Sequence, residues 1–586
     1  MNKYVLALAL IISSNVSAQS IPLYGLFEKQ LINTKNYNNS FSDVELIVNY
    51  TSPTGRIIRF FGFYDGDGKG GQNGNIWKFR FMPDEPGEWA YQYYWSDGTK
   101  GSTGKFNSTT KDAKPGPWKV NQQNPYWLTD SHGNHFLPIA FYAISHLAPI
   151  DWQDTIQWAE SKGYNTIITP TLNTTIWGNG WDNNTAFIKA YGNPHGSASG
   201  FLKWVDPDRY NLKMWHQWDN MIKTAGKKNI YISSFEGPSG KYGGQEGKYP
   251  PDELMFRPRI RDRFDSDRNR RFTKYFIARQ GAFWNLAYWS LGSTEVYQYA
   301  VADEEEFQDY INYIAAMTPW GRMITAQDVE QWHGIERRWL SQSSTPDSRK
   351  LNSLQTSISS PNYPHWGGSN IDNPHWQDAR PNNELALDSY AGFPLICTEC
   401  LWEGQGRARK PLRIIWGMLT AGAHTVWADW KYGDQGDSAE HKWGSIGRGW
   451  TPIKPLDGHV FKLTQLGQNT SGDEQLKYAM DLLSTLEFWK MKPHNEVVAG
   501  SKEAYCLAEL DKQYLIYLPE GGTLSLMLPQ GLYQSNWFNP HNAVTHITQS
   551  LSGGSTIKIN APNNNDWVLV ITRQETVDSS PNMVYN

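Results

Sequence analysis

Residues 391–410 read AGFPLICTECLWEGQGRARK, and they contain the most informative strand signal of the chain. Phe393 to Cys397 form a short, nearly continuous apolar run that Gly-Phe-Pro introduces. Such a run predicts a strand buried on both faces, as in a parallel sheet. The pattern predicts that the strand stops at Thr398-Glu399. The carboxylate of Glu399 is then expected at the carboxyl end of a buried strand.

A second stretch repeats this arrangement upstream, in NLAYWSLGSTE at residues 285–295. Ala287 to Leu291 predict a strand, Gly292 to Thr294 predict a turn, and Glu295 follows. An α/β barrel keeps its chemistry at the carboxyl ends of its strands, so Glu295 and Glu399 are expected on one face. Two such carboxylates suffice for retaining cleavage of a glycosidic bond, one as nucleophile and the other as acid/base. The alternative for each is a surface glutamate that merely ends a strand.

Strands and helices alternate from about residue 125, which is typical of a parallel sheet. Helical spacing of apolar residues predicts a helix that begins near Trp152 and ends at Gly163, and another that contains Trp215 and Ile222. Together with the two strands above, six further segments bring the count of predicted strands to eight: 136–142, 165–169, 230–234, 323–326, 353–358 and 425–428. Eight such strands predict a (β/α)8 TIM barrel.

Short alternating runs on either side of this region predict two flanking β-sandwich domains. The predicted organisation is a signal peptide, an N-terminal β-sandwich, a catalytic barrel, a C-terminal β-sandwich and a disordered tail, at residues 1–18, 19–114, 115–492, 493–575 and 576–586. The signal peptide is indicated by Lys3, the apolar run 4–12 and the small residues 16–18. The chain is therefore expected to be secreted or periplasmic in a bacterium, with no membrane span.

Composition favours a carbohydrate partner over nucleic acid. The net charge is -4, which argues against binding a polyanion by bulk electrostatics. Aromatic residues make up 14% of the chain, and their flat rings can stack on sugars or pack a sandwich core. Three cysteines are too few for a disulfide framework, and no metal or cofactor is predicted. Asp65, Asp67 and Asn75 could bind Ca²⁺, although a flexible glycine-rich turn is the favoured interpretation.

The two glutamate-bearing stretches resemble those of clan A glycoside hydrolases, and more closely those of the apiosidase-like group. The resemblance spans residues 21–575 and includes FPLICTECLWEG, the segment 277–295, the GFYDG and PGEW turns, and the C-terminal pieces YCLAELDKQYLIYLPEGG and NDWVLVI. It implies a barrel between an N-terminal sandwich and a collagenase-type C-terminal sandwich. It also implies Glu295 as acid/base and Glu399 as nucleophile. Many clan A members have Asn before the acid/base, where this chain has Thr294.

Candidate substrate-binding residues lie at predicted strand ends or in the loops that follow them: Tyr142, Asn173, Glu236, Trp402, Trp427, Asp429 and Trp430. Glu236 follows the third predicted strand and is a rival for either catalytic role. For the tryptophans at the barrel mouth, the alternative is that they only seal a hydrophobic layer.

The segment RPRIRDRFDSDRNRR, residues 257–271, has seven arginines and is expected to be a long loop on the same face. Guanidinium groups bind sulfate or carboxylate oxygens two at a time, so Arg261 and Arg263 are candidate contacts to an anionic glycan. A solvated, ion-paired loop is the alternative. Barrels of this type occur among enzymes that degrade red-algal galactans, which makes a carrageenan- or agar-type galactan the preferred substrate. An apiosidase-like plant side-chain glycosidase and a non-catalytic carbohydrate-binding protein are the alternatives.

Overall fold

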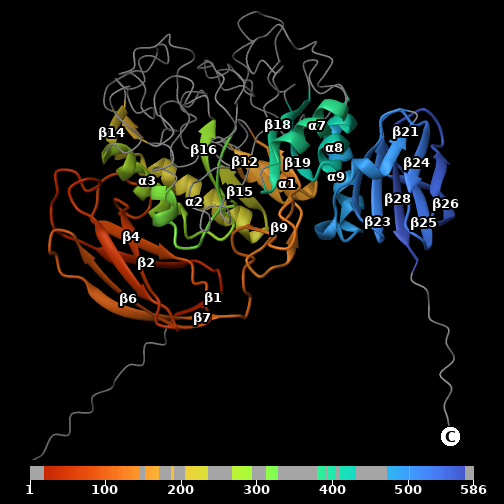
Figure 1. The fold of residues 1–586 in the computed structure, drawn as a ribbon. Coiled ribbons are helices and arrows are strands. Elements are labelled where there is room, and N and C mark those ends of the chain that lie inside the picture. The colour runs from red at the N-terminus through yellow and green to blue at the C-terminus, as the bar shows by residue number, and fades with distance from the viewer. Residues whose placement is uncertain are drawn as a thin grey trace, which may run out of the picture.

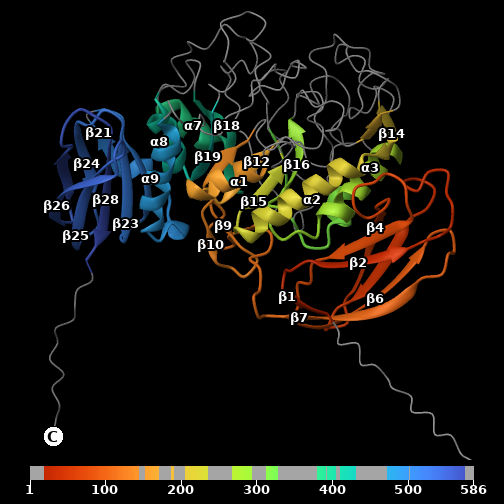
Figure 2. The ribbon, with the colours of Figure 1, turned by 180° about the vertical axis from the view of Figure 1, so that it is seen from behind.

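The computed structural model describes residues 19–143, 152–169, 187–189, 205–234, 267–293, 312–327, 379–390, 392–403, 410–429, 471–500 and 502–574. These residues form a sheet-rich molecule with a sandwich-like domain at each end and a parallel sheet with helices between them (Figures 1 and 2). The predicted signal peptide and tail lie outside the described residues. No described helix is both long enough and apolar enough to cross a membrane.

The N-terminal domain is one sheet of seven strands that folds over on itself, in the order β1-β7-β6-β3-β4-β5-β2. The fold occurs along β4, where residues 57–61 pair with β3 and residues 62–64 pair with β5. Gly62 lies at this change of partner, and a Cβ there would come within 2.3 Å of the Leu46 side chain. Facing layers meet through stacked rings, for example Phe27 on Phe106 at 4.0 Å between centroids. The expected N-terminal sandwich is therefore present, and its strands are β1 (Gln19–Pro22), β2 (Phe27–Ile32), β3 (Leu46–Thr51), β4 (Ile57–Tyr64), β5 (Ile76–Phe81), β6 (Gly87–Trp95) and β7 (Ser102–Thr109).

The central region contains a parallel sheet in the order β15-β12-β11-β19-β18 and a parallel pair β16-β17. Backbone hydrogen bonds from Ile232 N to Asn285 O (2.8 Å) and from Ala287 N to Ile232 O (2.9 Å) join β15 to the segment before β16. Strand order therefore follows chain order from β11 to β17, and the last strand, β19, pairs with the first. The expected strand 353–358 lies outside the described residues. The strands are β11 (Ala140–Tyr142), β12 (Thr166–Thr169), β15 (Tyr231–Ser234), β16 (Trp289–Ser293), β17 (Ile324–Gln327), β18 (Leu395–Glu403) and β19 (Ala423–Asp429).

Helices cover this sheet where the apolar spacing predicts them. In α2 (Leu212–Lys227), Trp215, Trp218, Ile222 and Ala225 are buried, and the Asn211 side chain accepts from Met214 N at the amino end. α1 (Trp152–Ser161) is followed by Gly163, which ends the helix at a φ of +80° that glycine adopts without strain. The other described helices are α3 (Asp267–Gln280), α7 (Ala379–Ser389), α8 (Pro411–Thr420) and α9 (Gly472–Ser484).

The first central strand is shorter than its apolar run. The run 136–142 predicts one strand, but only Ala140–Tyr142 join the parallel sheet as β11. His135 and Phe136 instead form β10 (His135–Phe136), which pairs antiparallel with β9 (Leu128–Thr129), and β9 pairs with β8 (Lys119–Val120). The local signal for this break is Pro138, which lies between the two strands and has no N–H to donate to a ladder.

The C-terminal domain has a six-stranded sheet, β20-β22-β23-β28-β25-β26, and a three-stranded sheet, β21-β24-β27. Trp537 and Trp567 pack edge to face in its core with centroids 6.2 Å apart, which confirms the prediction that they are core residues. The strands are β20 (Lys492–Pro493), β21 (Val498–Gly500), β22 (Tyr505–Glu509), β23 (Gln513–Leu518), β24 (Thr523–Met527), β25 (Leu532–Asn539), β26 (Val544–Ser552), β27 (Thr556–Asn560) and β28 (Trp567–Arg573).

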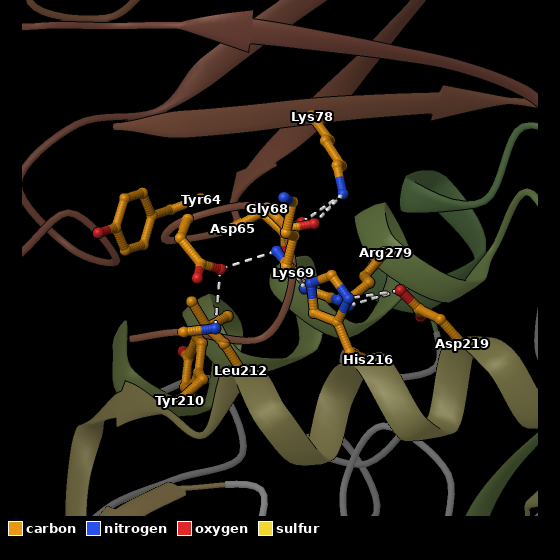
Figure 3. Close-up of polar contacts among 12 residues, drawn as sticks. Tyr64, Asp65, Gly68, Lys69, Lys78, Tyr210, Leu212, His216, Asp219 and Arg279 are labelled. Atoms are coloured by element: carbon orange, nitrogen blue, oxygen red, sulfur yellow. Dashed lines mark hydrogen bonds and ion pairs between the residues drawn. The ribbon is translucent and has the colours of Figure 1, made fainter. Parts of the chain in front are cut away.

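A buried ion network joins the N-terminal sandwich to α2 and α3 (Figure 3). Asp65 follows β4 and is fully buried, with Lys78 Nζ at 2.6 Å, Arg279 Nη1 at 2.7 Å and His216 Nε2 at 2.9 Å from its carboxylate. Burial alone raises the pKa of Asp65, but the cations more than offset it and hold the pKa well below its usual value. Because cationic side chains already surround this carboxylate, the structure does not support Asp65 as a calcium ligand.

Asp219 on α2 is the second acceptor of the network. Its carboxylate lies 2.8 Å from Arg80 Nη2 and 2.9 Å from Arg279 Nη2, and it also accepts from Gln280 Nε2 at 2.6 Å. Burial raises its pKa, whereas Arg279 and Arg80 lower it, with a net value of about 2. Arg80 belongs to β5 and Arg279 to α3, so Asp219 connects three elements from two domains.

Replacing Asp219 by Ala is expected to destabilise the protein strongly. The change leaves Arg80 and Arg279 buried without this acceptor, which typically costs about 3–5 kcal/mol of unfolding free energy. Urea unfolding monitored by tryptophan fluorescence measures the loss. Glu88→Ala is the control, because its partner Lys105 and Glu88 are both 60% exposed and such pairs contribute about 0–1 kcal/mol. Similar losses in the two variants would contradict a buried, desolvated network.

Candidate functional site

Strand β18 does not end at Glu399, contrary to the prediction. Leu395–Cys397 pair with residues 423–425, the register then shifts, and residues 401–403 pair with residues 427–429. Residues 398–400 therefore lie opposite a single residue of β19. The strand resumes because Leu401 is apolar and fully buried, which returns the chain to the sheet. Glu399 consequently lies within an interruption of the strand, and such irregularities often re-aim a side chain beside an active site.

The expected site residues that the structure describes lie on three adjacent parallel strands. Glu399 and Trp402 belong to β18, Asp429 ends β19, and Tyr142 ends β11. Trp402 pairs with Ala428 across the β18–β19 ladder. Because these strands run parallel, their carboxyl ends share one edge of the sheet. Tyr142 is only 4% exposed.

The other candidates lie outside the described residues: Glu295, Asn173, Glu236, Trp430, Arg261 and Arg263. The strands that precede two of them have the expected position, since β16 ends at Ser293 and β15 ends at Ser234.

Part of the arginine-rich segment is helical rather than a loop. α3 begins at Asp267 and so contains the last three of the seven arginines. Arg271 Nη2 lies 2.5 Å from Asp208 Oδ1, and the Arg270 guanidinium lies over the Tyr313 ring at 5.1 Å. For these two residues the structure supports the ion-paired, structural alternative.

Trp427 does not present a surface on which a sugar could stack, which corrects its expected role. The side chain has no exposed area, and its ring packs beside those of Phe141, Trp158 and Tyr164 at centroid distances of 5.6, 6.0 and 6.3 Å. Trp158 is on α1, so Trp427 points from the sheet toward its helix layer. Its indole Nε1 donates to Glu403 Oε2 at 2.7 Å.

Glu403 is a buried residue that no sequence pattern singled out. It ends β18 and is 5% exposed. Besides Trp427, its carboxylate accepts from Ser471 N at 3.1 Å and from Gly472 N at 2.7 Å, at the amino end of α9. This end of a helix favours negative charge. Burial nevertheless raises the pKa of Glu403, and the nearby Asp473 adds to the rise against the lowering effect of the hydrogen bonds.

The described residues contain no group of three or more side chains able to hold a metal ion. Cys397 takes part in a disulfide bond, so its sulfur is not available as a thiolate ligand. Cys506 is a free thiol buried in the C-terminal sandwich. What the described site offers is acid–base chemistry, in the form of carboxylates at the carboxyl ends of parallel strands.

Two family models match the two ends of the chain. Residues 20–96 match a domain of unknown function, DUF5060, and residues 493–572 match a model described as "Putative collagen-binding domain of a collagenase". No curated protein matches the chain.

Solved structures similar to this chain are described as glycoside hydrolases. One, a "putative glycoside hydrolase" from Bacteroides vulgatus ATCC 8482, has 14% identity and a TM-score of 0.66, over 95% of this chain and 100% of its own. Another, a glycoside hydrolase family 5 protein from the same organism, has 14% identity and a TM-score of 0.51, over 79% of this chain and 95% of its own. At such identities the likeness is one of fold. The chain thus shares the architecture of solved glycoside hydrolases along most of its length.

The stability contributed by Glu403 is expected to depend on pH. Because its pKa is raised on folding, the folded protein retains this proton at pH values where the unfolded chain has lost it, and stability falls as pH rises through that window. Glu403→Gln cannot titrate at this position. The difference in melting temperature, wild type minus Glu403→Gln, should therefore decrease as pH rises above about 4.3, the ordinary pKa of glutamate. A difference that stays constant above this pH in thermal scans would contradict the raised pKa.

Proposed function

We propose that this protein is a retaining glycoside hydrolase with a (β/α)8 barrel, in which Glu399 is the nucleophile and Glu295 the acid/base. One observation carries the proposal: the parallel strands follow chain order, the last pairs with the first, and Glu399 lies in β18 where its pairing with β19 shifts register. The likeness to glycoside hydrolase structures supports it at the level of fold.

Pairing between β11 and β19 supports a closed barrel rather than an open sheet. An open parallel sheet has two edges, whereas here the first and last strands of the series are hydrogen-bonded neighbours through Ala140–Val426 and Phe141–Trp427. Seven strands of the series are described, and the expected segment 353–358 would supply the eighth between β17 and β18. In such a barrel the chemistry lies at the carboxyl ends of the strands.

The proposed reaction uses the two glutamates at different protonation states. Glu399 attacks the anomeric carbon as a carboxylate, while protonated Glu295 donates its proton to the leaving oxygen. Carboxyl groups about 5–5.5 Å apart would make this arrangement retaining. The charge on Glu399 raises the pKa of Glu295, and the covalent intermediate removes that charge. Glu295 can then lose its proton and activate the incoming water.

The proposed enzyme is exported by a bacterium and acts on an algal polysaccharide. The proposed substrate is a carrageenan- or agar-type galactan, whose anionic groups bind Arg261 and Arg263. The signal-like N-terminus and the arginine-rich segment support this choice. A sugar-release assay tests the substrate. It compares algal galactans with plant polysaccharides that carry apiose or other side chains, and the released products are identified by mass spectrometry. Binding without any released product would favour the non-catalytic alternative.

Glu399→Gln is expected to abolish turnover without disturbing the fold. Loss of a covalent nucleophile should cost several kcal/mol of barrier, so activity should fall by more than about a thousandfold. Glu384→Gln makes the same chemical change at an exposed residue of α7 and should retain wild-type activity. Both variants are compared by reducing-sugar release and circular dichroism. Residual activity within about tenfold of wild type would rule out Glu399 as the nucleophile.

The pair Arg261→Ala and Arg263→Ala should raise KM for an anionic polysaccharide and leave hydrolysis of a small neutral aryl glycoside almost unchanged. Each lost contact to a charged group is worth about 1.5–3 kcal/mol, or roughly tenfold or more in KM. Arg59→Ala, an exposed arginine of the N-terminal sandwich, is the matched control. Equal losses on charged and neutral substrates would mean that the segment only stabilises the fold.

A further inference from the structure

Arg322 is a buried guanidinium with no carboxylate partner among the described residues. It precedes β17 and is 1% exposed. Its Nη2 donates to Gly281 O and to Phe283 O, both at 3.0 Å, but Nε and Nη1 have no hydrogen-bond partner. An unpaired charge in the interior is costly, and the other fully buried arginines, Arg80 and Arg279, both pair with Asp219.

A second cation lies beside Arg322. Lys119, at the start of β8, donates to Trp320 O at 2.7 Å and to Gly321 O at 3.0 Å, immediately before Arg322 in the chain. Burial lowers the pKa of Lys119 to about 8, and repulsion from Arg322 contributes to the shift. The negative charge of Asp84 raises the pKa of Lys119, but Asp84 forms its own salt bridge with Arg56, with 2.6 Å between Oδ1 and Nη2. The Trp289 ring lies 5.6 Å from the Arg322 guanidinium, but no carboxylate of the described residues pairs with Arg322, so the local charge is positive.

The same cluster contains a third unsatisfied donor. Trp118 is fully buried, and its indole Nε1 has no partner. Its ring packs against that of Tyr231 at 5.5 Å, and Tyr231 also interacts electrostatically with Arg322. The Tyr231 hydroxyl already donates to Gly116 O at 2.8 Å. The unsatisfied groups of Arg322 and Trp118 are all N–H donors.

Donors without acceptors favour an anion over water. A water molecule accepts hydrogen bonds but also brings two hydrogens of its own, which need acceptors. A water molecule could still donate to the second lone pair of a nearby carbonyl, but it carries no charge and would leave the charge of Arg322 and Lys119 uncompensated. An anion accepts from every N–H group and compensates the positive charge as well.

We propose that Arg322, Lys119 and Trp118 form the binding site of a small inorganic anion of the size of chloride. The site lies where the linker after the N-terminal sandwich meets the turn before β17. Trp320 in that turn donates from Nε1 to Met82 O of the sandwich at 2.6 Å, so the anion would hold this domain junction together. The proposal is independent of the catalytic function proposed above.

Thermal unfolding of the full chain tests the proposal, with sodium chloride replacing sodium gluconate at constant ionic strength. Gluconate is a much larger anion than chloride and serves as the non-binding reference, so the melting temperature should rise with chloride and saturate, by about 2–4 °C. Arg322→Met should remove the chloride dependence. Arg59→Met, which removes an exposed arginine, should keep it.

Trp118→Phe is the second variant, in case Arg322→Met does not fold. It removes one N–H donor and keeps most of the packing, so the chloride midpoint should shift to roughly tenfold higher concentration. Equal melting temperatures of the wild type in chloride and gluconate would overturn the proposal. It would also be overturned if Trp118→Phe, and Arg322→Met where it folds, kept the wild-type midpoint. A crystal soaked in bromide should show an anomalous peak next to Arg322.

Discussion

The buried carboxylates of Asp65 and Asp219 are the constraint on which the arrangement of the N-terminal half depends. Each accepts from more than one cation, and Arg279 bridges the two. A single charged partner would leave the desolvation of these groups uncompensated, whereas the shared network satisfies several donors at once. Because its members belong to β5, α2, α3 and the turn after β4, the sandwich cannot move away from the helices without exposing unpaired charges.

This constraint also bears on the catalytic region. α2 packs against β15, and Phe276 of α3 meets Trp289 of β16 with ring centroids 5.6 Å apart; these two strands precede Glu236 and Glu295 in the chain. A sandwich locked to these helices therefore restricts movement of the parallel strands on the side that would carry the proposed acid/base. The N-terminal sandwich helps to bury the charged side chains of Asp219 on α2 and Arg279 on α3.

On the opposite side of the region, Glu403 has a comparable role for β18. It joins the end of this strand to Trp427 on β19 and to the first backbone amides of α9. The ladder is thus fixed both before and after residues 398–400, and the interruption that contains Glu399 is held between two anchored segments. A proposed nucleophile gains from such support, because small displacements of a reacting group reduce rates strongly.

The sequence by itself predicted the elements and their order. Apolar runs and helical spacing located most central strands to within a few residues, the ends of α1, the buried face of α2, both sandwiches, and Trp537 and Trp567 as core residues. These features follow from local periodicity, which requires no knowledge of neighbours. Tertiary structure alone revealed that β18 continues to Glu403, that Trp427 faces the helix layer, and that Arg322 lacks a counterion. Asp65 and Arg279 are 214 residues apart, so no local sequence pattern can predict their contact. Successive side chains of a strand point to opposite faces of its sheet, which the sequence alone establishes. Only the neighbouring elements determine which face is buried against helices and which faces the interior.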